Sequence, residues 1–280
     1  MELKSRTKKI KLDKPLVMGV LNVTPNSFYE KGKYTEVNDA VARFDEMVKE
    51  GADIVDVGGE STGPGSKDVD AKEELKRVLP VLKKICKKRT KCWISIDTYK
   101  ASVAKAALKE GVNMVNDVMA LRADPALVKL LKKEKVPVVL MYSKDDNGRT
   151  SRKKPKYEDV VNEVKTFLKK RIKFAKESGI AAEQIILDPG QGAFISMDPA
   201  ESCKILKRLK EFRQFGHPVL VGSSRKSFIG EVLDLPLEER LEGSLACATA
   251  AILNGASIIR THDVAATRRA VDMAWAIKNS

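Results

Sequence analysis

The sequence predicts an α/β protein in which eight parallel strands close into a (βα)8 barrel, the TIM-barrel class. The chain has 280 residues, close to the roughly 250 residues typical of such a barrel. Apolar residues make up 43% of it and aromatic residues only 5%, which is typical of the aliphatic cores of buried parallel strands and their helices. Short apolar runs also alternate with longer amphipathic stretches, and strict alternation of strand and helix requires a parallel sheet.

Eight apolar runs are expected to form the strands, and eight amphipathic stretches the helices. The predicted strands are Leu16–Val23, Asp53–Gly59, Trp93–Thr98, Met114–Val118, Pro137–Ser143, Ile185–Gly190, Pro218–Ser224 and Ser257–Asp263. The predicted helices are Glu36–Glu50, Asp68–Lys88, Ala101–Glu110, Pro125–Lys133, Glu158–Ser178, Ala200–Gln214, Leu237–Asn254 and Ala265–Asn279. Because no linker divides these units, a single domain is expected over residues 1–280, with residues 1–14 as an N-terminal extension. The polar loop Lys144–Lys156 is expected to be mobile.

Composition argues against several partners. The net charge of +14 is carried mainly by helix-like stretches, and no recognition helix, stacking platform or zinc finger accompanies it, so no nucleic-acid partner is expected. The four cysteines form no C-x-x-C pair, which favours reduced thiols in a cytoplasmic protein. No apolar run reaches the ~18 residues of a membrane span, and no G-x-G-x-x-G or P-loop motif is present.

Polar side chains lie where almost every predicted strand ends. In such barrels the active site occupies this carboxyl end, and a strand buried on both faces does not tolerate an unpaired carboxylate. Any single residue of this kind can be an ordinary hydrogen-bonded group or a helix cap, but the convergence of the set indicates a binding site. The set comprises Asn22, Asp56, Glu60, Thr62, Asp97, Asn116, Asp188, Ser224, Arg225, Lys226, Arg260 and His262.

One part of the set suits a heterocyclic ring. Asp97, Asn116 and Asp188 offer carboxylate and amide groups, and a carboxylate can accept two parallel hydrogen bonds from the N–H-rich edge of an aminopyrimidinone. Lys226 follows as a mobile positive charge in the SSRKSFIG turn. These residues predict one wall of the site, which binds the ring of the substrate by hydrogen bonds.

The other part suits an anion. Arg260 supplies a planar fork for phosphate oxygens, and His262 lies two residues further on the same side of the strand. Asn22 offers a neutral oxygen to a divalent cation such as Mg2+ that keeps most of its waters, and Thr62 adds a hydroxyl group. His217 is at the opposite end of its strand and is expected to be structural. Together the two walls predict a phosphorylated heterocycle as substrate.

The motifs resemble those of dihydropteroate synthases. MGVLNVTPNSF (Met18–Phe28) is similar to that family's first-loop signature and GADIVDVGGEST-PG to its second; ISIDTYK, VNDV, ILDPG, VGSSRKSFIG and IRTHDV follow in the family's order. The resemblance extends from Leu16 to Ala276, and SRKSFIG together with DVGGEST and NVTP-SF is highly specific.

The resemblance implies a transferase of folate biosynthesis that joins 6-hydroxymethyl-7,8-dihydropterin diphosphate to p-aminobenzoate and releases diphosphate. It also implies Mg2+ as cofactor and a homodimer. By this resemblance the catalytic residues would be Lys226, Asp97, Arg260 and His262. The pterin would be bound by Asp97, Asn116, Asp188, Lys226, Met141 and Gly222, and the metal by Asn22. The diphosphate or p-aminobenzoate would be bound by Thr62, Pro64, Phe28, Phe194, Ser224, Arg260 and His262.

Three loops depart from the family pattern. Asn26 stands where the family usually has Asp, and Gly63 where it usually has Arg. Because such a pair can join two closing loops, we expect closure to use other contacts, with Lys31 or Lys33 as candidates. The third departure is DPGQGAFISMDP, in which Phe194 keeps an aromatic residue near the site. This run also resembles the loop of sulfonamide-insensitive members, which predicts reduced sulfonamide sensitivity.

Other functions remain open at this stage. A pterin-dependent methyltransferase shares the barrel and the ring-reading residues, but it has no need of the SRK turn or of the Arg260–His262 pair. A pterin-binding paralogue that uses a different arylamine, or that binds without turnover, is kept open by Gly63. A barrel that binds nucleic acid has no support beyond the charge.

Overall fold

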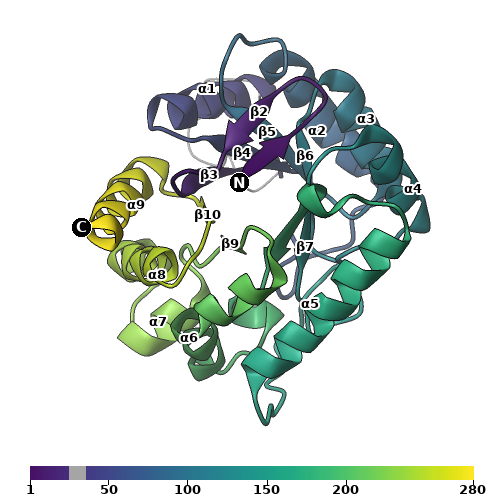
Figure 1. Cartoon of the computed structure of the whole chain (residues 1–280). Coiled ribbons are helices and arrows are strands. Elements are labelled where there is room, and N and C mark those ends of the chain that lie inside the picture. The colour runs from purple at the N-terminus through teal and green to yellow at the C-terminus, as the bar shows by residue number, and fades with distance from the viewer. Residues whose placement is uncertain (25–35) are drawn as a thin grey trace.

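Eight parallel strands form the barrel in the computed structural model, which describes residues 1–24 and 36–280 (Figure 1). The strands are β3 (Leu16–Asn22), β4 (Ile54–Gly58), β5 (Trp93–Asp97), β6 (Met114–Asp117), β7 (Val138–Met141), β8 (Ile185–Asp188), β9 (Leu220–Val221) and β10 (Ile258–Thr261). They pair in the order β8-β7-β6-β5-β4-β3-β10-β9. The ends of this sheet meet through a parallel bridge between Leu187 and Val219. The predicted (βα)8 fold is thereby confirmed.

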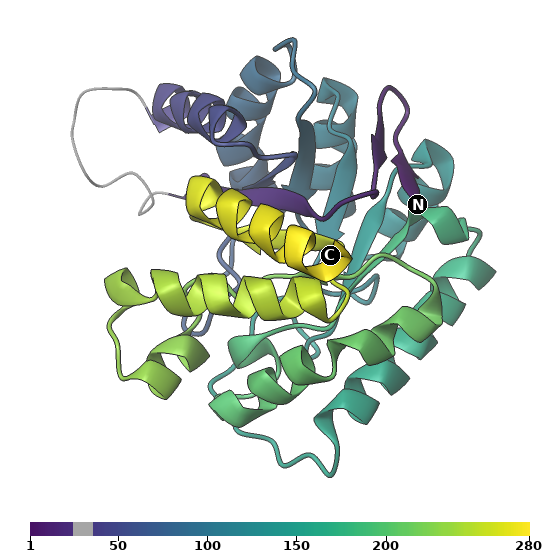
Figure 2. The same ribbon diagram turned by 60° about the vertical axis from the view of Figure 1, so that its left-hand side comes forward.

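Helices surround the barrel as an outer ring (Figures 1 and 2). They are α1 (Glu36–Lys49), α2 (Ala71–Ile85), α3 (Ala101–Glu110), α4 (Pro125–Glu134), α5 (Val160–Glu177), α6 (Pro199–Lys207), α7 (Ser227–Leu233), α8 (Leu241–Leu253) and α9 (Val264–Asn279). Side chains of aspartates cap four of them by accepting first-turn N–H groups, which sets where each helix begins. These caps are Asp70, Asp124, Asp159 and Asp198.

Three helical segments differ from the prediction. The SSRKSFIG stretch, expected as a turn, continues into α7, which is only seven residues long and too short to give a periodic pattern. The segment predicted at 200–214 divides at Arg208, which leaves the helical conformation and binds Asp159; a 3-10 helix, Leu209–Phe215, follows. The segment predicted at 237–254 begins as a 3-10 turn, Leu237–Glu239, before α8.

Residues 1–14 close the amino end of the barrel. β1 (Glu2–Lys4) and β2 (Lys9–Lys11) form an antiparallel hairpin across it. Leu3 is 1% exposed and packs into a cluster of inward-facing apolar side chains, among them Met18, Ile54 and Trp93. The segment expected as an extension is therefore part of the barrel core.

The inward-facing side chains change from apolar to polar along the strands. Residues two apart on a strand face the same way. On several strands an inward-facing apolar residue of the lower layer is therefore followed, two positions later, by a polar residue that also faces inward. Going up the barrel, these pairs are Ile54 and Asp56, Met114 and Asn116, Ile186 and Asp188, and Ile258 and Arg260. On β5 the series runs from Trp93 through Ser95 to Asp97. The carboxyl end is thus the polar end of the barrel.

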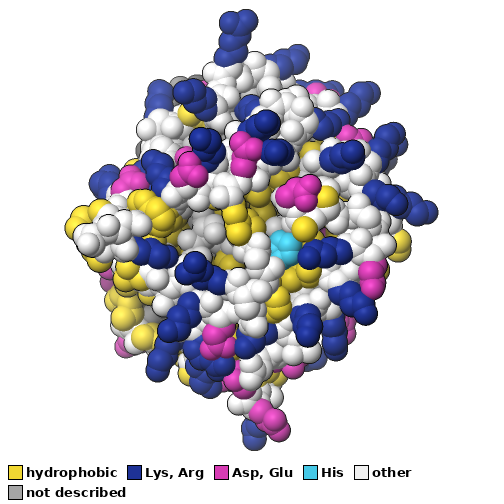
Figure 3. All heavy atoms as spheres, in the orientation of Figure 1, with side chains coloured by type: hydrophobic (Ala, Val, Ile, Leu, Met, Phe, Trp, Pro, Cys, Tyr) yellow, Lys and Arg dark blue, Asp and Glu magenta, His cyan; other side chains and the backbone are white. Residues whose placement is uncertain are grey.

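The charge is dispersed on the face that carries the hairpin. Figure 3 shows Lys and Arg side chains over the whole hairpin face, with Asp and Glu among them and no single basic patch. All four cysteines are free. Within residues 1–24 and 36–280, no helix has the length and apolar character needed to cross a bilayer.

Candidate active site

Arg260 lies at the centre of the polar end of the barrel. Its Nε donates to Asp56 Oδ2 at 2.8 Å and its Nη2 donates to Asp97 Oδ2 at 2.9 Å. Asn116 Nδ2 donates to the same Asp56 oxygen at 2.9 Å. Burial alone would lower the pKa of Arg260, but the two carboxylates raise it above its usual value, so the guanidinium stays charged. Two of its five N–H donors are used, which leaves three for a ligand.

The pKa of Asp97 differs from that of an ordinary carboxyl group. Burial, followed by the neighbouring Asp56 carboxylate, raises the pKa of Asp97 well above its usual range, while Arg260 acts in the opposite direction. Two carboxylates that share one guanidinium favour retention of a proton on one of them. Perturbed groups of this kind concentrate at functional sites.

Lys226 and Asp188 form the second half of the cluster. Lys226 Nζ donates to the backbone oxygen of Gln191 at 3.1 Å and lies 5.3 Å from the centre of the Phe194 ring. Burial lowers the pKa of Lys226 to about 8, against the opposing effect of Asp188. Burial also raises the pKa of Asp188, whose Oδ1 accepts from Gly190 N at 2.8 Å.

Several buried polar atoms of this region have no partner among the residues that the structure describes. They are Asp56 Oδ1, Asn116 Oδ1, Ser95 Oγ, Ser223 Oγ and both amide atoms of Gln191. Leaving buried polar atoms unpaired costs about 1–3 kcal/mol each. Oxygens and an amide left open at one end of a barrel, beside Arg260 and Lys226, are what a polar ligand requires.

The turn after β9 aims Lys226 at the barrel. Arg225 adopts a left-handed backbone, with φ of 53°, and its guanidinium makes two bonds of 2.8 Å to Asp263. Ser224 Oγ accepts from the backbone N–H of His262 at 3.1 Å. These contacts tie the β9 turn to the end of β10, and they make Arg225 a residue that orients the turn.

His262 extends past the end of β10 with part of its ring exposed. Loss of hydration among the surrounding protein atoms, and then the positive charge of Arg260, lower its pKa to about 4. The imidazole is therefore neutral near pH 7 and offers a hydrogen bond to an anion. His217, at the opposite end of its strand, is buried, and its structural role stays a prediction.

Asn22 and Gly222 lie next to this cluster. A Cβ placed on Gly58 would lie 3.6 Å from Asn22 Oδ1 and 3.6 Å from Asp97 Cβ, and one on Gly222 would lie 3.6 Å from Arg260 Cβ. Asn22 and Gly222 therefore border the charged groups. Met141 belongs to a small apolar cluster with Val118 and Met119, against which Tyr99 and Phe194 pack.

Thr62, Gly63 and Pro64 lie in the loop after β4, where the backbone oxygen of Thr62 accepts from Thr150 N at 3.1 Å. Phe28 lies outside the described residues, as do Asn26, Lys31 and Lys33, so the predictions for them stay predictions.

Two residues gain importance from the structure. Asp56 had no individual role in the sequence interpretation, although it ends an apolar strand; it is fully buried and joins Arg260 to Asn116. Gln191 lies in the departing DPGQGAF run and is fully buried. The signal in the sequence was a polar residue directly after the ILDPG motif, which could have marked Gln191 as a residue of the site.

Cavity volume does not locate the site. A cavity of about 570 Å3 lies beside β2 at the amino end of the barrel and is lined by Lys8, Lys11, Asp53 and Trp93, among others. The carboxyl end carries the unpartnered polar atoms and the coupled charges, so we place the site there. Within the described part of the chain, no group of three or more His, Cys, Asp or Glu residues forms a metal cluster.

A barrel with a charged, polar carboxyl end defines a class, and comparison with known proteins identifies it. Residues 18–262 match the family described as pterin binding enzyme. The chain belongs to this family and, within it, to the dihydropteroate synthases. It is 42% identical over 271 residues to the dihydropteroate synthase of Escherichia coli K12, covering 97% of this chain and 94% of the relative. The Bacillus subtilis enzyme is 40% identical, covering 95% and 90%.

Solved structures agree along the whole chain. Xanthomonas albilineans dihydropteroate synthase with 4-aminobenzoic acid superposes with a TM-score of 0.92 at 40% identity, covering 100% of this chain and 98% of that one. The same enzyme in complex with 7,8-dihydropteroate gives 0.89 at 38% identity, with both chains fully covered.

Proposed function

We propose that this barrel condenses 6-hydroxymethyl-7,8-dihydropterin diphosphate with p-aminobenzoate to form dihydropteroate, with Arg260 as the centre of its substrate site. The observation that carries the proposal is the contact of one guanidinium with both Asp56 and Asp97, beside buried polar atoms that have no partner within residues 1–24 and 36–280. Family membership supplies the reaction, and this geometry supplies the residues.

The ring is assigned to the acidic side of the cluster. Asp97, Asn116 and Asp188 present carboxylate and amide groups from β5, β6 and β8, and each can pair with N–H groups of the pterin edge. Lys226 keeps two free N–H donors after its bond to Gln191, and we assign one of them to the carbonyl side of the ring. Met141 and Gly222 complete the pocket.

The diphosphate is assigned to the basic rim. Arg260 and His262 face it, with Ser224 and Thr62 as hydroxyl donors. Asn22 fits a divalent cation as a single neutral oxygen near Asp97, in a site whose other ligands are water and the diphosphate itself. Mg2+ bound there would neutralise part of the diphosphate charge.

In the reaction the C–O bond to diphosphate breaks with its electron pair leaving on oxygen, and a C–N bond to the aromatic amine forms as that nitrogen loses a proton. Arg260 and Lys226 stabilise the charge that develops on the departing group. The buried carboxylates stabilise the positive charge left on the ring methylene. Phe194, Thr62 and Pro64 orient the amine, which needs position more than activation.

The direct test is incubation with the pterin diphosphate, Mg2+ and p-aminobenzoate, with diphosphate and dihydropteroate measured together. Formation of the two products in equal amounts is expected. Diphosphate release without the condensed product would replace p-aminobenzoate by another acceptor, and a panel of arylamines would then identify it. Absence of both products would refute the proposal.

We also propose a homodimer, built on the face formed by α7, α8 and α9, and a cytoplasmic location. Large apolar side chains are exposed on this face: Val232, Leu233, Leu237, Met273 and Ile277. A mass measurement in solution is expected to give twice the chain mass, and a Val232→Glu, Met273→Glu variant is expected to be a monomer. A monomeric parent protein would refute the dimer.

A further inference from the structure

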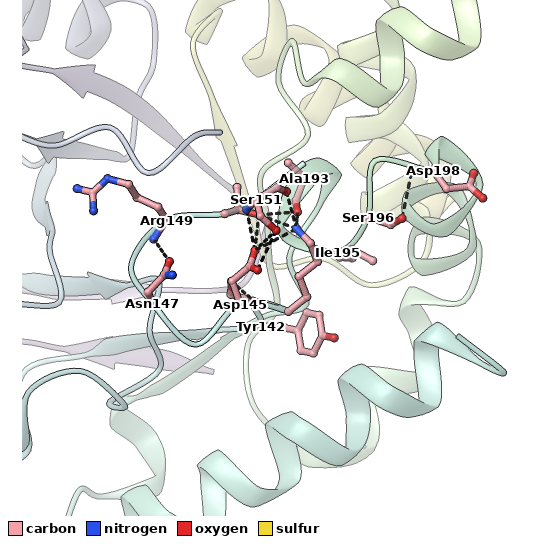
Figure 4. Close-up of polar contacts among 12 residues, drawn as sticks. Tyr142, Asp145, Asn147, Arg149, Ser151, Ala193, Ile195, Ser196 and Asp198 are labelled. Atoms are coloured by element: carbon pink, nitrogen blue, oxygen red, sulfur yellow. Dashed lines mark hydrogen bonds and ion pairs between the residues drawn. The ribbon is translucent and has the colours of Figure 1, made fainter. Parts of the chain in front are cut away.

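The loop after β7, expected from its composition to be mobile, is internally braced. Asp145 accepts from Ser151 N at 2.8 Å and from Ser151 Oγ at 2.9 Å, which closes residues 145–151 into a ring (Figure 4). A Cβ on Gly148 would fall 2.4 Å from the Tyr99 ring, so this loop lies directly on that side chain. We call residues 144–151 the bridge loop.

On one side the bridge loop holds the loop after β4. The Arg149 guanidinium binds the carboxylates of Glu60 and Asp68 and donates to the backbone oxygen of Lys67 at 2.9 Å. Thr150 N donates to the backbone oxygen of Thr62 at 3.1 Å. One arginine thus reaches both ends of the segment that carries Thr62 and Pro64.

On the other side it holds the loop after β8. Lys144 N donates to Phe194 O at 2.9 Å, and Lys144 Nζ donates to Ala193 O. Thr150 Oγ1 also donates to Ala193 O, at 2.6 Å. Figure 4 shows Arg149 extending away from the contacts around Asp145 and Ala193, so the two attachments lie on different sides of the loop.

Arg149 compensates negative charge buried beneath the loop after β4, which strengthens its attachment to that loop. The side chain of Glu60 is 4% exposed and that of Glu74 is 1% exposed. Lys100 binds both carboxylates, at 2.5 Å for Glu74, but it supplies one positive charge for two negative ones. Arg149 supplies the second. Removing one partner from such a buried pair leaves an uncompensated charge, which is strongly destabilising.

We propose that the bridge loop, through Arg149 and Lys144, sets the spacing of the two walls that receive the arylamine, with Arg149 as a positioning residue. This inference rests on the proposed function, because Thr62, Pro64 and Phe194 are the residues assigned there to the second substrate. The described hydrogen bonds of the ring-binding residues involve no residue of the bridge loop. The loss of Arg149 is therefore expected to affect the arylamine before the pterin. The bridge loop reaches the pterin-binding Lys226 only through the loop after β8, whose Phe194 ring lies 5.3 Å from Lys226 Nζ.

The test compares Arg149→Met with Arg152→Met, a control one residue beyond the bridge loop whose exposed arginine makes no side-chain contact that the structure describes. We expect Arg149→Met to raise KM for p-aminobenzoate by at least ~10-fold, the loss of one charge-assisted contact. Binding of the pterin diphosphate, measured by calorimetry without the arylamine, is expected to stay within about twofold. Lys144→Met, which frees the other attachment, is expected to raise the same KM.

A readout independent of turnover separates this inference from the proposed function. Hydrogen exchange of residues 59–68 is expected to speed up in Arg149→Met and to be restored in part by Arg149→Lys, which keeps the charge but not the fork. If p-aminobenzoate is not the acceptor, the exchange result still holds. Unchanged exchange and unchanged KM, or equal losses in pterin binding and arylamine KM, would overturn the positioning role.

Discussion

Replacing Asp56 by Asn tests whether the buried carboxylate positions the guanidinium of Arg260. The change is nearly isosteric, removes one negative charge and keeps one acceptor oxygen. Asp56 Oδ2 now accepts from both Arg260 Nε and Asn116 Nδ2. A neutral asparagine oxygen at the same place can still accept from both donors, but it lacks the negative charge that strengthens the two bonds. The amide N–H groups take the place of Asp56 Oδ1, which has no partner among the described residues.

The magnitude follows from those two contacts. A hydrogen bond to a charged group is worth about 1.5–3 kcal/mol, and Arg260 keeps its bond to Asp97, so the loss is expected at about 2–3 kcal/mol. Expressed in the transition state, this is a decrease of roughly 30- to 150-fold in kcat/KM for the pterin diphosphate. Loss of the Asp56 charge should also lower the pKa of Asp97, because that charge helps to raise it.

The assay is diphosphate release at varied pterin diphosphate, with the free energy of unfolding measured in parallel by urea denaturation. Asp53→Asn is the matched control. Asp53 lies just before the same strand at the opposite end of the barrel, where it accepts from Val17 N at 2.9 Å and binds Arg268 at 3.0 Å. It is expected to lose stability but to keep kcat/KM within about twofold. Near-normal kcat/KM in Asp56→Asn, or an equal loss in Asp53→Asn, would refute the reasoning.

The remaining predictions concern charge, pH, the core and inhibition. Lys226→Ala and Asp97→Ala should each lower kcat/KM by at least ~100-fold, and near-normal turnover in either would remove that residue from the site. Because the pKa of Lys226 is lowered to about 8, its charge is present below that pH and lost above it; kcat/KM for the pterin diphosphate should fall above pH 8, and a pH–rate profile of Lys226→Arg should lack that decline. Leu3→Ala should lower the free energy of unfolding by about 2–4 kcal/mol, as measured in urea, whereas a detachable extension would give no change. The ratio of sulfonamide Ki to p-aminobenzoate KM should exceed that of the Escherichia coli relative measured alongside, and an equal ratio would discard the inference drawn from the DPGQGAF run.

The barrel was predictable because its signal repeats. All eight strands lie within the runs predicted from apolar content, since each strand is buried on both faces and leaves an unbroken apolar pattern. The hairpin of residues 1–14 was not predicted. Its strands are three residues long, and its stability comes from Leu3 packing into the barrel, a contact with no local trace in the sequence.

The charged centre was partly predictable. Asp97, Asn116, Asp188 and Arg260 each interrupt an apolar run, and the structure brings all four to the same end of the barrel. Which carboxylates bind Arg260 depends on register across strands, since Asp56 reaches it from 204 residues away. The structure therefore shows this pairing, but the sequence does not. The different contacts of Asp56 and Asp97 likewise become apparent only in the structure.

The paired departure at Asn26 and Gly63 has a physical consequence for the loop after β4. In the usual family pattern, an arginine on this loop could pair with an aspartate on the first loop. Here Gly63 has no side chain, and Arg149 reaches the loop from the β7 side and binds Glu60 and Asp68. The described contacts that hold the loop after β4 therefore come from the β7 side. If this loop positions the arylamine, Arg149→Met should raise KM for p-aminobenzoate before it changes the affinity for the pterin diphosphate.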